Sequence, residues 1–229
     1  MNSKEYALIV AAGRGTRIKS DRPKQFLLLN GLPILMHTIR AFHEYSSTIE
    51  IVLVLPEDQI PAWHTLCSEH NFNIPITIQP GGETRFQSVK RGLEIMKEGL
   101  VAIHDGVRPL VSQEIIARSF VIAAKKDSAV AAVPLKESIR IADGEGTKAM
   151  DRTRFRSIQT PQTFKVSIIR EAYELKEDPS MTDDASVAEK AGQQISLFEG
   201  SYDNLKITTE DDLVIAEALL TRKRAGVSS

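Results

Sequence analysis

Cysteine is nearly absent from this chain, since Cys67 is the only one among 229 residues. A single thiol cannot form an internal disulfide or supply the thiolates of a metal cluster, and this fits a protein of the reducing cytosol. Long apolar runs are also missing, because the stretch from Ala7 to Ala12 is too short for a signal-peptide core or a membrane span. We therefore expect a cytoplasmic protein that does not enter a membrane.

An excess of one charge is missing too. The chain has 29 basic and 30 acidic residues, which gives a formal net charge of -1. This balance predicts no general attraction to nucleic acid or to an anionic membrane surface, so any bound anion must be held by a local cluster of cations. Hydrophobic residues make up 42% and charged residues 26%, as in an ordinary globular protein.

Apolar runs of strand length alternate with segments of helical spacing. We expect strands at 6–11, 51–55, 74–79, 100–104 and 129–134, and helices at 34–45, 58–70, 86–96 and 112–125. In the first helix Leu35, Ile39 and Phe42 fall on one stripe, and Thr84 with Gln87 has the spacing of a capping box. Such alternation predicts an α/β protein with a parallel sheet and right-handed crossovers.

The alternation breaks between Leu135 and Arg156. Residues 137–142 alternate like a two-sided strand, 143–146 have turn chemistry, and a polar return strand follows. We expect a hairpin that protrudes from the sheet and buries little within one subunit, which indicates a surface for a partner. Helices are then expected at 165–177 and 182–191, a strand at 195–199 and a last helix from Thr209. The best count is one domain, 1–229, with an arm at 135–156.

The first segment that could carry chemistry follows the first strand. It reads Ala11-Ala-Gly-Arg-Gly-Thr-Arg17 and continues to Arg22-Pro-Lys24. Glycines let the backbone approach a phosphate chain, and ligands of open α/β sheets bind at this edge. The spacing is not a P-loop, which needs Gly-Lys-Ser/Thr at its end, and it is not the dinucleotide fingerprint, because position 18 is Ile. A solvated basic loop is the alternative.

Each of the later polar segments, taken alone, could have a purely structural role instead of a functional one. Gly81-Gly82 could be only a tight turn, Asp105 and Arg108 only a structural ion pair, and Thr182 and Thr209 only helix N-caps. Lys206 lies in an expected strand between the apolar Leu205 and Ile207, where it could be only an outward-facing residue. A metal-dependent phosphohydrolase could use His104-Asp105, but the other four histidines, His37, His43, His64 and His70, show no ligand spacing around it.

In order, however, the segments resemble one family. The first loop is followed by Gly-Gly-x-x-Arg-x-x-Ser at 81–88, His-Asp-x-x-Arg-Pro at 104–109, Asp-Arg at 151–152, Thr-Pro-Gln at 160–162, Thr-Asp-Asp-Ala at 182–185 and Asp-Asn-x-Lys-x-Thr at 203–208. This series is similar to the 2-C-methyl-D-erythritol 4-phosphate cytidylyltransferases of the non-mevalonate isoprenoid route, from about Ala7 to Leu219. The resemblance implies a Rossmann-like, mostly parallel twisted sheet with helices on both faces, a nucleotidyltransferase fold and a protruding β-hairpin arm.

The resemblance also implies a reaction. A phosphate oxygen of the polyol phosphate attacks the α-phosphorus of CTP in line and pyrophosphate leaves, so catalysis rests on positioning and electrostatics. It implies that Arg17 and Lys24 stabilise the five-coordinate phosphorus, while Arg152 and Lys206 orient the incoming phosphate. Mg²⁺ is expected to be held mainly by the CTP phosphates, with Asp105 as the candidate protein ligand.

The binding residues follow from the same resemblance. Those expected to contact CTP are Ala11, Ala12, Gly13, Gly15, Gly82, Ser88, Asp105 and Gly106. Those expected to contact the polyol phosphate are Asp105, Arg108, Ser138, Thr160 and Thr182. The arm resembles a dimer clasp, which implies a homodimer with Arg152 and Ser138 delivered to a site shared between subunits.

The sequence departs from the family pattern at a few positions. Gly106-Val107 stands where two alanines are usual, Ser138 where many relatives have Thr, and Glu83-Thr84 where Asp-Glu is frequent. None of these removes a charge from the implied chemistry, although no role is carried over to positions 83 and 84.

Two other functions stay open. Ribitol 5-phosphate cytidylyltransferases share the fold and the CTP chemistry, but tend to have Ala-Gly-Gly in the first loop and to lack the Asp-Arg pair after the arm. A non-catalytic nucleotide-binding regulator on the same fold is the alternative of another class. It would bind CTP without releasing pyrophosphate, and it would tolerate loss of Arg17 or Lys24.

Overall fold

A central sheet of seven strands organises the chain. The computed structural model describes residues 3–13, 22–144 and 146–224. The strands lie in the order β11-β7-β10-β6-β1-β4-β5, and only β10 runs antiparallel to its neighbours. Their bounds are β1 Glu5–Val10, β4 Glu50–Leu55, β5 Thr77–Pro80, β6 Leu100–Asp105, β7 Ser128–Pro134, β10 Arg156–Lys165 and β11 Leu197–Glu199. The expectation of a mostly parallel α/β sheet is confirmed.

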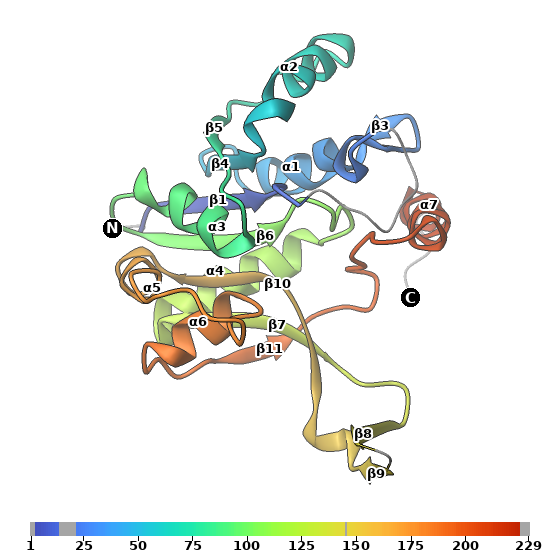
Figure 1. The fold of residues 1–229 in the computed structure, drawn as a ribbon. Helices are drawn as coiled ribbons and strands as arrows, with labels where there is room; N and C mark the ends of the chain where they lie inside the picture. The colour runs from blue at the N-terminus through green and yellow to red at the C-terminus, as the bar shows by residue number, and fades with distance from the viewer. Residues whose placement is uncertain (1–2, 14–21, 145, 225–229) are drawn as a thin grey trace.

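Helices cover both faces of this sheet (Figure 1). One apolar cluster joins the sheet to α1 Ile34–Tyr45, α2 Ile60–Glu69 and α4 Gln113–Lys126. A second cluster joins the other face to α3 Arg85–Glu94, α5 Val166–Ala172 and α6 Asp184–Lys190. Burial on both faces is why β1, β4 and β6 read as continuous apolar runs rather than as alternating ones. The predicted stripe of Leu35, Ile39 and Phe42 is fully buried in α1.

The last helix, α7 Glu210–Arg224, lies apart from these two layers. It packs with Leu29, Ile34, Val107 and Leu110 in a smaller apolar cluster. Thr209 caps this helix as predicted, because its hydroxyl accepts a hydrogen bond from the Asp212 N–H at 3.2 Å. The short strands β2 Leu28–Leu29 and β3 Leu32–Pro33 form a small hairpin of their own.

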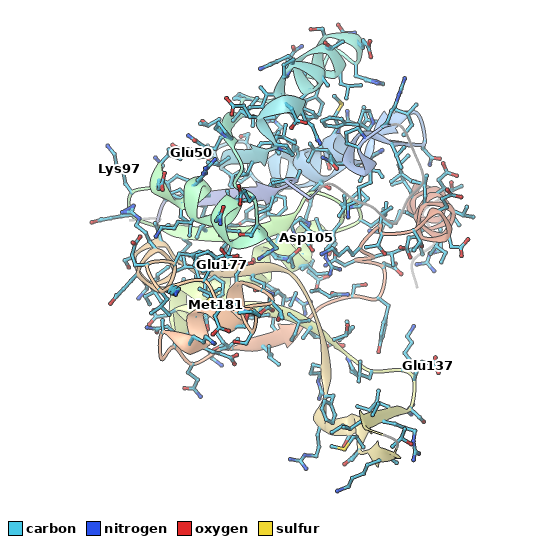
Figure 2. All side chains as sticks on the ribbon, in the orientation of Figure 1. Glu50, Lys97, Asp105, Glu137, Glu177 and Met181 are labelled. Atoms are coloured by element: carbon cyan, nitrogen blue, oxygen red, sulfur yellow. The ribbon has the colours of Figure 1, made fainter. Side chains whose placement is uncertain are left out.

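The predicted arm is present. Strands β8 Ile139–Asp143 and β9 Gly146–Met150 pair only with each other, and they stand away from the sheet (Figure 1). Figure 2 shows Glu137 at the arm, well separated from Asp105 near the middle of the molecule. Ile141, Phe155 and Ile158 on the arm and its base are large apolar side chains exposed to solvent.

Three local expectations were wrong. Residues 156–165 form the long strand β10, which was not predicted, because its buried positions carry polar side chains such as Gln159, Thr160 and Gln162. The N-cap of α6 is Asp183 and not Thr182, since the Asp183 carboxylate accepts from the Ser186 N–H and completes a capping box. Residues 205–207 do not form a strand.

The parallel strands end together at one edge of the sheet. Val10 at the end of β1 lies beside Asp105 at the end of β6, and β4 and β5 end next to them at Leu55 and Pro80. The carboxyl edge of an open parallel sheet is where such folds bind ligands. The motif segments that follow β1, β5 and β6 therefore meet at this edge.

Candidate active site

A cavity of about 910 Å³ opens at this carboxyl edge. That volume lies near the upper end of the range that small-molecule and cofactor sites usually occupy, roughly 300–1,000 Å³. Of the sequence-predicted site residues, those that line it are Ala11, Ala12, Gly13, Lys24, Gly82, Asp105 and Lys206. The structure thus brings together residues as far apart in the sequence as Ala11 and Lys206.

The loop after β1 forms one wall. Ala11, Ala12 and Gly13 border the cavity, whereas Gly15 and Arg17 lie outside the described residues. Lys24 borders the cavity from a 3-10 turn, Lys24–Phe26, which follows Pro23. The neighbouring Gln25 is buried, and its amide donates to the Ala11 carbonyl at 3.1 Å. This hydrogen bond ties the lysine-bearing turn to the end of β1.

The glycine pair after β5 forms the opposite wall. A Cβ on Gly81 would lie 2.8 Å from the Ala12 Cβ, so the two loops touch only because this residue has no side chain. Ser88 is fully buried and does not line the cavity; its hydroxyl accepts from the Gly82 N–H at 3.1 Å and donates to the Thr84 carbonyl at 2.8 Å. Ser88 therefore fixes the shape of the glycine loop.

The capping box predicted at Thr84 is half present. The Thr84 hydroxyl accepts from the Gln87 N–H at 3.1 Å and caps α3. The Gln87 side chain, however, accepts from the Glu83 N–H rather than from the Thr84 N–H. This directs the first turn of α3, including Arg85, toward the cavity, where Arg85 is one of the lining residues.

Asp105 is the centre of a cationic cluster at the floor of the cavity. One carboxylate oxygen lies 3.1 Å from the Arg108 Nε and 3.0 Å from the Lys206 Nζ, and the other lies 3.8 Å from the Arg85 Nε. Burial by itself would raise the pKa of the Asp105 carboxyl, but the charges of Arg85, Lys206 and Arg108 outweigh it and hold the pKa well below its usual range. Asp105 is therefore an anion, and with Asp184, the other carboxylate bound to Arg85, two anions face three cations, which leaves the cluster positive.

Hydrogen bonds from Thr160 and His104 orient this floor. The Thr160 hydroxyl accepts from the Asp105 N–H at 3.1 Å and contacts the His104 Nδ1 at 3.0 Å. The His104 Nε2 lies 3.2 Å from the Arg108 carbonyl, which can only accept, so Nε2 carries the proton and Nδ1 accepts from Thr160. Burial lowers the pKa of His104 to about 4, so the imidazole is neutral at pH 7.

Arg108 and Gly106 pack beneath the residues that line the cavity. Arg108 is buried, and it donates to the Asn204 carbonyl at 2.8 Å in addition to its ion pair with Asp105. A Cβ on Gly106 would lie 2.9 Å from the Ala11 Cβ, so this glycine lets the loop after β6 pack against the end of β1. Neither residue lines the cavity itself.

Lys206 reaches the cluster from an extended segment without strand pairing. The backbone of this segment is attached to the loop after β6, because the Ile207 N–H donates to the Val107 carbonyl at 2.9 Å. Ile207 is buried, while the Lys206 side chain lies along the cavity with its ammonium on Asp105. The alternative of an outward-facing strand lysine is therefore wrong.

Three predicted residues lie elsewhere. Ser138 and Arg152 are on the exposed arm, where Arg152 donates to the Lys136 carbonyl. Thr182 is exposed on the loop before α6. Within one chain the structure does not bring Ser138 or Arg152 to the cavity.

Residues that the sequence analysis gave no role also line the cavity. Arg85 is the main one: it stands in the motif Gly-Gly-x-x-Arg-x-x-Ser, three residues after Gly82, but the motif by itself assigned it no role. Glu57 and Asp58 border the cavity from the turn after β4. Their position just after the buried parallel strand β4 could have indicated a site residue, because the segments that were predicted to bind substrates also follow such strands.

The donor set limits how a metal ion could bind. Within residues 3–13, 22–144 and 146–224, no group of three or more His, Cys, Asp or Glu side chains could hold a metal. Asp105 has one oxygen between Arg108 and Lys206, whereas its other oxygen has Arg85 only at 3.8 Å. The site therefore fits a cation that brings most of its ligands with the substrate and takes one oxygen from Asp105.

The chain resembles known proteins over nearly its whole length. The model of the 2-C-methyl-D-erythritol 4-phosphate cytidylyltransferase family matches residues 6–222. Proteins of that name from Porphyromonas gingivalis and Bacteroides fragilis are 47% and 46% identical, over 96% and 93% of this chain and 100% and 98% of theirs.

Solved structures agree with the sequence comparison. The crystal structure of a 4-diphosphocytidyl-2C-methyl-D-erythritol synthase from Anaerococcus prevotii superposes with a TM-score of 0.83 at 28% identity, over 96% of this chain and 99% of that one. The 2-C-methyl-D-erythritol 4-phosphate cytidylyltransferase from Thermus thermophilus gives a TM-score of 0.77 at 32% identity, over 96% and 100% of the two chains. In the described part of this chain no helix is long and apolar enough to cross a bilayer.

Proposed function

The chain belongs to the 2-C-methyl-D-erythritol 4-phosphate cytidylyltransferase family, and from this membership we propose that it transfers CMP from CTP to 2-C-methyl-D-erythritol 4-phosphate. The products are 4-diphosphocytidyl-2-C-methyl-D-erythritol and pyrophosphate, in the synthesis of isoprenoid precursors by the non-mevalonate route. The observation that carries the proposal is the family match over residues 6–222 together with a cavity whose floor and wall carry Asp105, Lys206 and Lys24.

The reaction needs cations rather than a strong base. A phosphate oxygen of the polyol phosphate, already an anion, forms a bond to the α-phosphorus of CTP as the bond from that phosphorus to the β-phosphate oxygen breaks. Two anions must meet, and charge accumulates on the five-coordinate phosphorus. Fixed positive groups in a cavity that excludes water lower this barrier, because they are in place before the charge develops.

Each wall of the cavity has a part in this proposal. The glycine loops at 11–13 and 81–82 receive the nucleotide, and Ser88 keeps the second loop in shape by its hydrogen bond from Gly82. Lys24 stabilises the α-phosphate and Lys206 the incoming phosphate. Arg17 is assigned to the α-phosphate by family resemblance alone, since it lies outside the described residues.

Arg108 and Thr160 do not line the cavity, and we propose that they act mainly by holding Asp105 in place. Arg108 is buried with both Asp105 and the Asn204 carbonyl as partners, so its guanidinium raises the potential felt by a bound phosphate and also holds the floor in place. Thr160 keeps Asp105 oriented through its backbone N–H. Thr182, exposed before α6, is proposed to contact the polyol phosphate at the rim.

Magnesium is proposed to accompany the triphosphate. When bound it would neutralise phosphate charge, with CTP oxygens as its main ligands and the oxygen of Asp105 that faces away from Lys206 as the protein ligand. This arrangement is supported by the finding that no three His, Cys, Asp or Glu side chains of the described residues are grouped so that they could hold a metal by themselves.

The arm is proposed to join two copies of the chain. Its strands β8 and β9 pair only with each other, and Ile141, Phe155 and Ile158 are exposed there. Such a surface is typical of a partner interface. In a two-fold dimer each arm would carry Arg152 and Ser138 to the partner's cavity, which fits their distance from the cavity of their own chain. We propose one domain, 1–229, with 135–156 as the dimer contact, acting in the cytoplasm.

Pyrophosphate release tests the function. The purified chain is incubated with Mg²⁺, one nucleoside triphosphate and one polyol phosphate, and pyrophosphate is measured with time. We expect release only with CTP and 2-C-methyl-D-erythritol 4-phosphate together. Faster release with ribitol 5-phosphate would instead assign the chain to ribitol 5-phosphate cytidylyltransferase chemistry. CTP binding without release with either polyol would identify a nucleotide-binding regulator.

A further inference from the structure

The guanidinium of Arg85 is held by a residue that has no part in the mechanism above. Its Nη1 donates to one oxygen of Asp184 at 2.7 Å and its Nη2 to the other at 2.6 Å. This is the bidentate arrangement that fixes an arginine in orientation as well as in place. Both terminal nitrogens face Asp184, so only the Nε edge of Arg85 faces Asp105, at 3.8 Å.

Asp184 is itself fixed. Its side chain has no exposed surface, although that of Arg85 is 31% exposed. The Tyr173 hydroxyl donates to the Asp184 Oδ1 at 2.6 Å, and burial raises the pKa of Tyr173 well above its ordinary value, so that this hydroxyl keeps its proton. Asp184 is buried at the first position of α6, so its carboxylate is the fixed partner and the more exposed Arg85 takes its orientation from it.

Gln162 holds the backbone on both sides of Asp184. Its Nε2 donates to the Asp183 carboxylate at 2.9 Å, and its Oε1 accepts from the Ala185 N–H at 2.8 Å. Gln162 lies on β10 two residues after Thr160, whose hydroxyl accepts from the Asp105 N–H. The contacts therefore form a closed ring, from Asp105 through Arg85, α6 and β10 back to Asp105.

This ring joins the two sides of the proposed reaction. Arg85 opens α3 three residues after Gly82, which belongs to the glycine loop assigned to CTP. Asp184 opens α6 two residues after Thr182, which is assigned to the polyol phosphate. Asp105, between them, is bound to Lys206 at 3.0 Å. Figure 2 shows Asp105 centrally, between the helices of one face and the segment before α7.

We propose that Asp184 is a positioning residue, which by fixing the fork of Arg85 keeps the Asp105 carboxylate available to Lys206 and so sets the place of the lysine ammonium in the cavity. This inference rests on the proposed function. Without Asp184 the guanidinium of Arg85, whose Nε already lies 3.8 Å from Asp105, can turn its terminal nitrogens onto that carboxylate and compete with Lys206 for it. The ammonium then loses its fixed position, although no group that touches a substrate has been removed.

A double-mutant cycle tests the proposal in the full-length chain. Asp184→Asn, Arg85→Gln and the double variant are compared by kcat and by KM for each substrate. Misplacing a charged group by about 1 Å can lower turnover by about 100-fold, so we expect each single variant to lose about 10–100-fold in kcat. We expect the double variant to be within about 3-fold of the worse single one, because Asp184 acts only through Arg85. Losses that multiply in the double variant overturn the proposal.

Two further variants separate positioning from folding. Arg85→Lys keeps the positive charge beside Asp105 but cannot form the fork, and it is expected to lose kcat as Asp184→Asn does. Tyr173→Phe removes one hydrogen bond to the same carboxylate and leaves the ion pair, and it is the matched control with a change below about 3-fold. An Arg85→Lys variant with the wild-type kcat overturns the proposal even if Asp184→Asn does not fold.

The wild-type assay separates this inference from the proposed function. If the wild-type chain releases no pyrophosphate with any polyol phosphate, the proposed function fails. If the wild type is active and the Asp184 and Arg85 losses multiply, only the positioning role fails. Thermal denaturation of each variant without substrates shows whether the folded fraction, rather than kcat, has changed.

Discussion

Replacing Asp105 by Asn removes the carboxylate that Arg85, Arg108 and Lys206 share, and the structure gives the size of the expected effect. The side chain of Asp105 is 10% exposed, as is that of Arg108, so this ion pair at 3.1 Å is buried. Breaking a buried pair by removing one partner costs about 3–5 kcal/mol, because the remaining charge stays in a medium of low polarity.

The other two cations bring the expected loss of stability toward the lower end of this range, for the following reason. Lys206 is 40% exposed and can turn its ammonium into water, while Arg85 keeps its ion pair with Asp184 at 2.6 Å. We therefore expect Asp105→Asn to lower the free energy of unfolding by about 3 kcal/mol, most of it from Arg108. For a chain of this size about 1 kcal/mol corresponds to about 2–4 °C, which gives a fall in Tm of about 6–12 °C.

Thermal denaturation without substrates measures this, and Asp127→Asn is the matched control. Asp127 pairs with Lys165 at 2.5 Å, but both side chains are nearly half exposed, so the pair is screened by water. Its loss is expected to change stability by less than about 1 kcal/mol. Asp127 also has a φ of 67°, a conformation that Asn adopts readily. The reasoning is refuted if Asp105→Asn lowers Tm no more than the control does.

Four other outcomes are expected. Lys24→Ala should lower turnover in the pyrophosphate assay by about 10²–10³-fold, and a loss below about 10-fold contradicts its role at the α-phosphate. Phe155→Glu should halve the molar mass seen by light scattering, whereas an unchanged mass excludes the arm as the dimer contact. Equimolar mixing of inactive Arg152→Ala and Lys24→Ala chains should restore about a quarter of wild-type activity. Half of the dimers are then mixed, and in each of them one of the two sites combines an intact Lys24 with the partner's intact Arg152. No recovery means that Arg152 acts within its own chain. Burial lowers the pKa of His104 to about 4 from 6.5, so its contribution to stability is complete above pH 6.5 and lost as the pH falls toward 4; an NMR titration that gives a pKa near 6.5 contradicts this.

The sequence predicted the sheet well where both faces of a strand are buried. The strands at 6–11, 51–55 and 100–104 read as apolar runs because their side chains are covered on both sides, and β1, β4 and β6 lie within a residue or so of those bounds. The helix at 34–45 was predicted at both ends, since its apolar stripe is regular and the chain leaves the helix at Ser46.

The strand β10 was missed for a physical reason. Gln159, Thr160, Gln162 and Thr163 are buried in it, yet each has a hydrogen-bonding side chain whose usual place is a loop. Their partners lie far away in the sequence: Thr160 bonds with His104 and Asp105, and Gln162 with Asp183 and Ala185. Reading the residues one segment at a time therefore cannot reveal that they are satisfied inside the protein.

The same limit applies to the site. The family motifs identified Asp105, Lys24 and Lys206, all of which line the cavity, and of these Asp105 stands beside a glycine at the end of a strand. The role of Arg85 is set by Asp184, ninety-nine positions away, and that pairing depends on how α3 and α6 pack on one face of the sheet. Lys206 was expected in a strand because Leu205 and Ile207 are apolar, but only Ile207 is buried.

The fate of an oxygen label tests most directly whether the polyol phosphate attacks CTP. The chain is supplied with CTP and 2-C-methyl-D-erythritol 4-phosphate whose phosphate oxygens are labelled with ¹⁸O, and the products are resolved by ³¹P NMR. We predict a diphosphate product in which the label bridges its two phosphorus atoms, with none in the pyrophosphate released. Label in the pyrophosphate, or no cytidine diphosphate product at all, would contradict the proposed transfer of CMP.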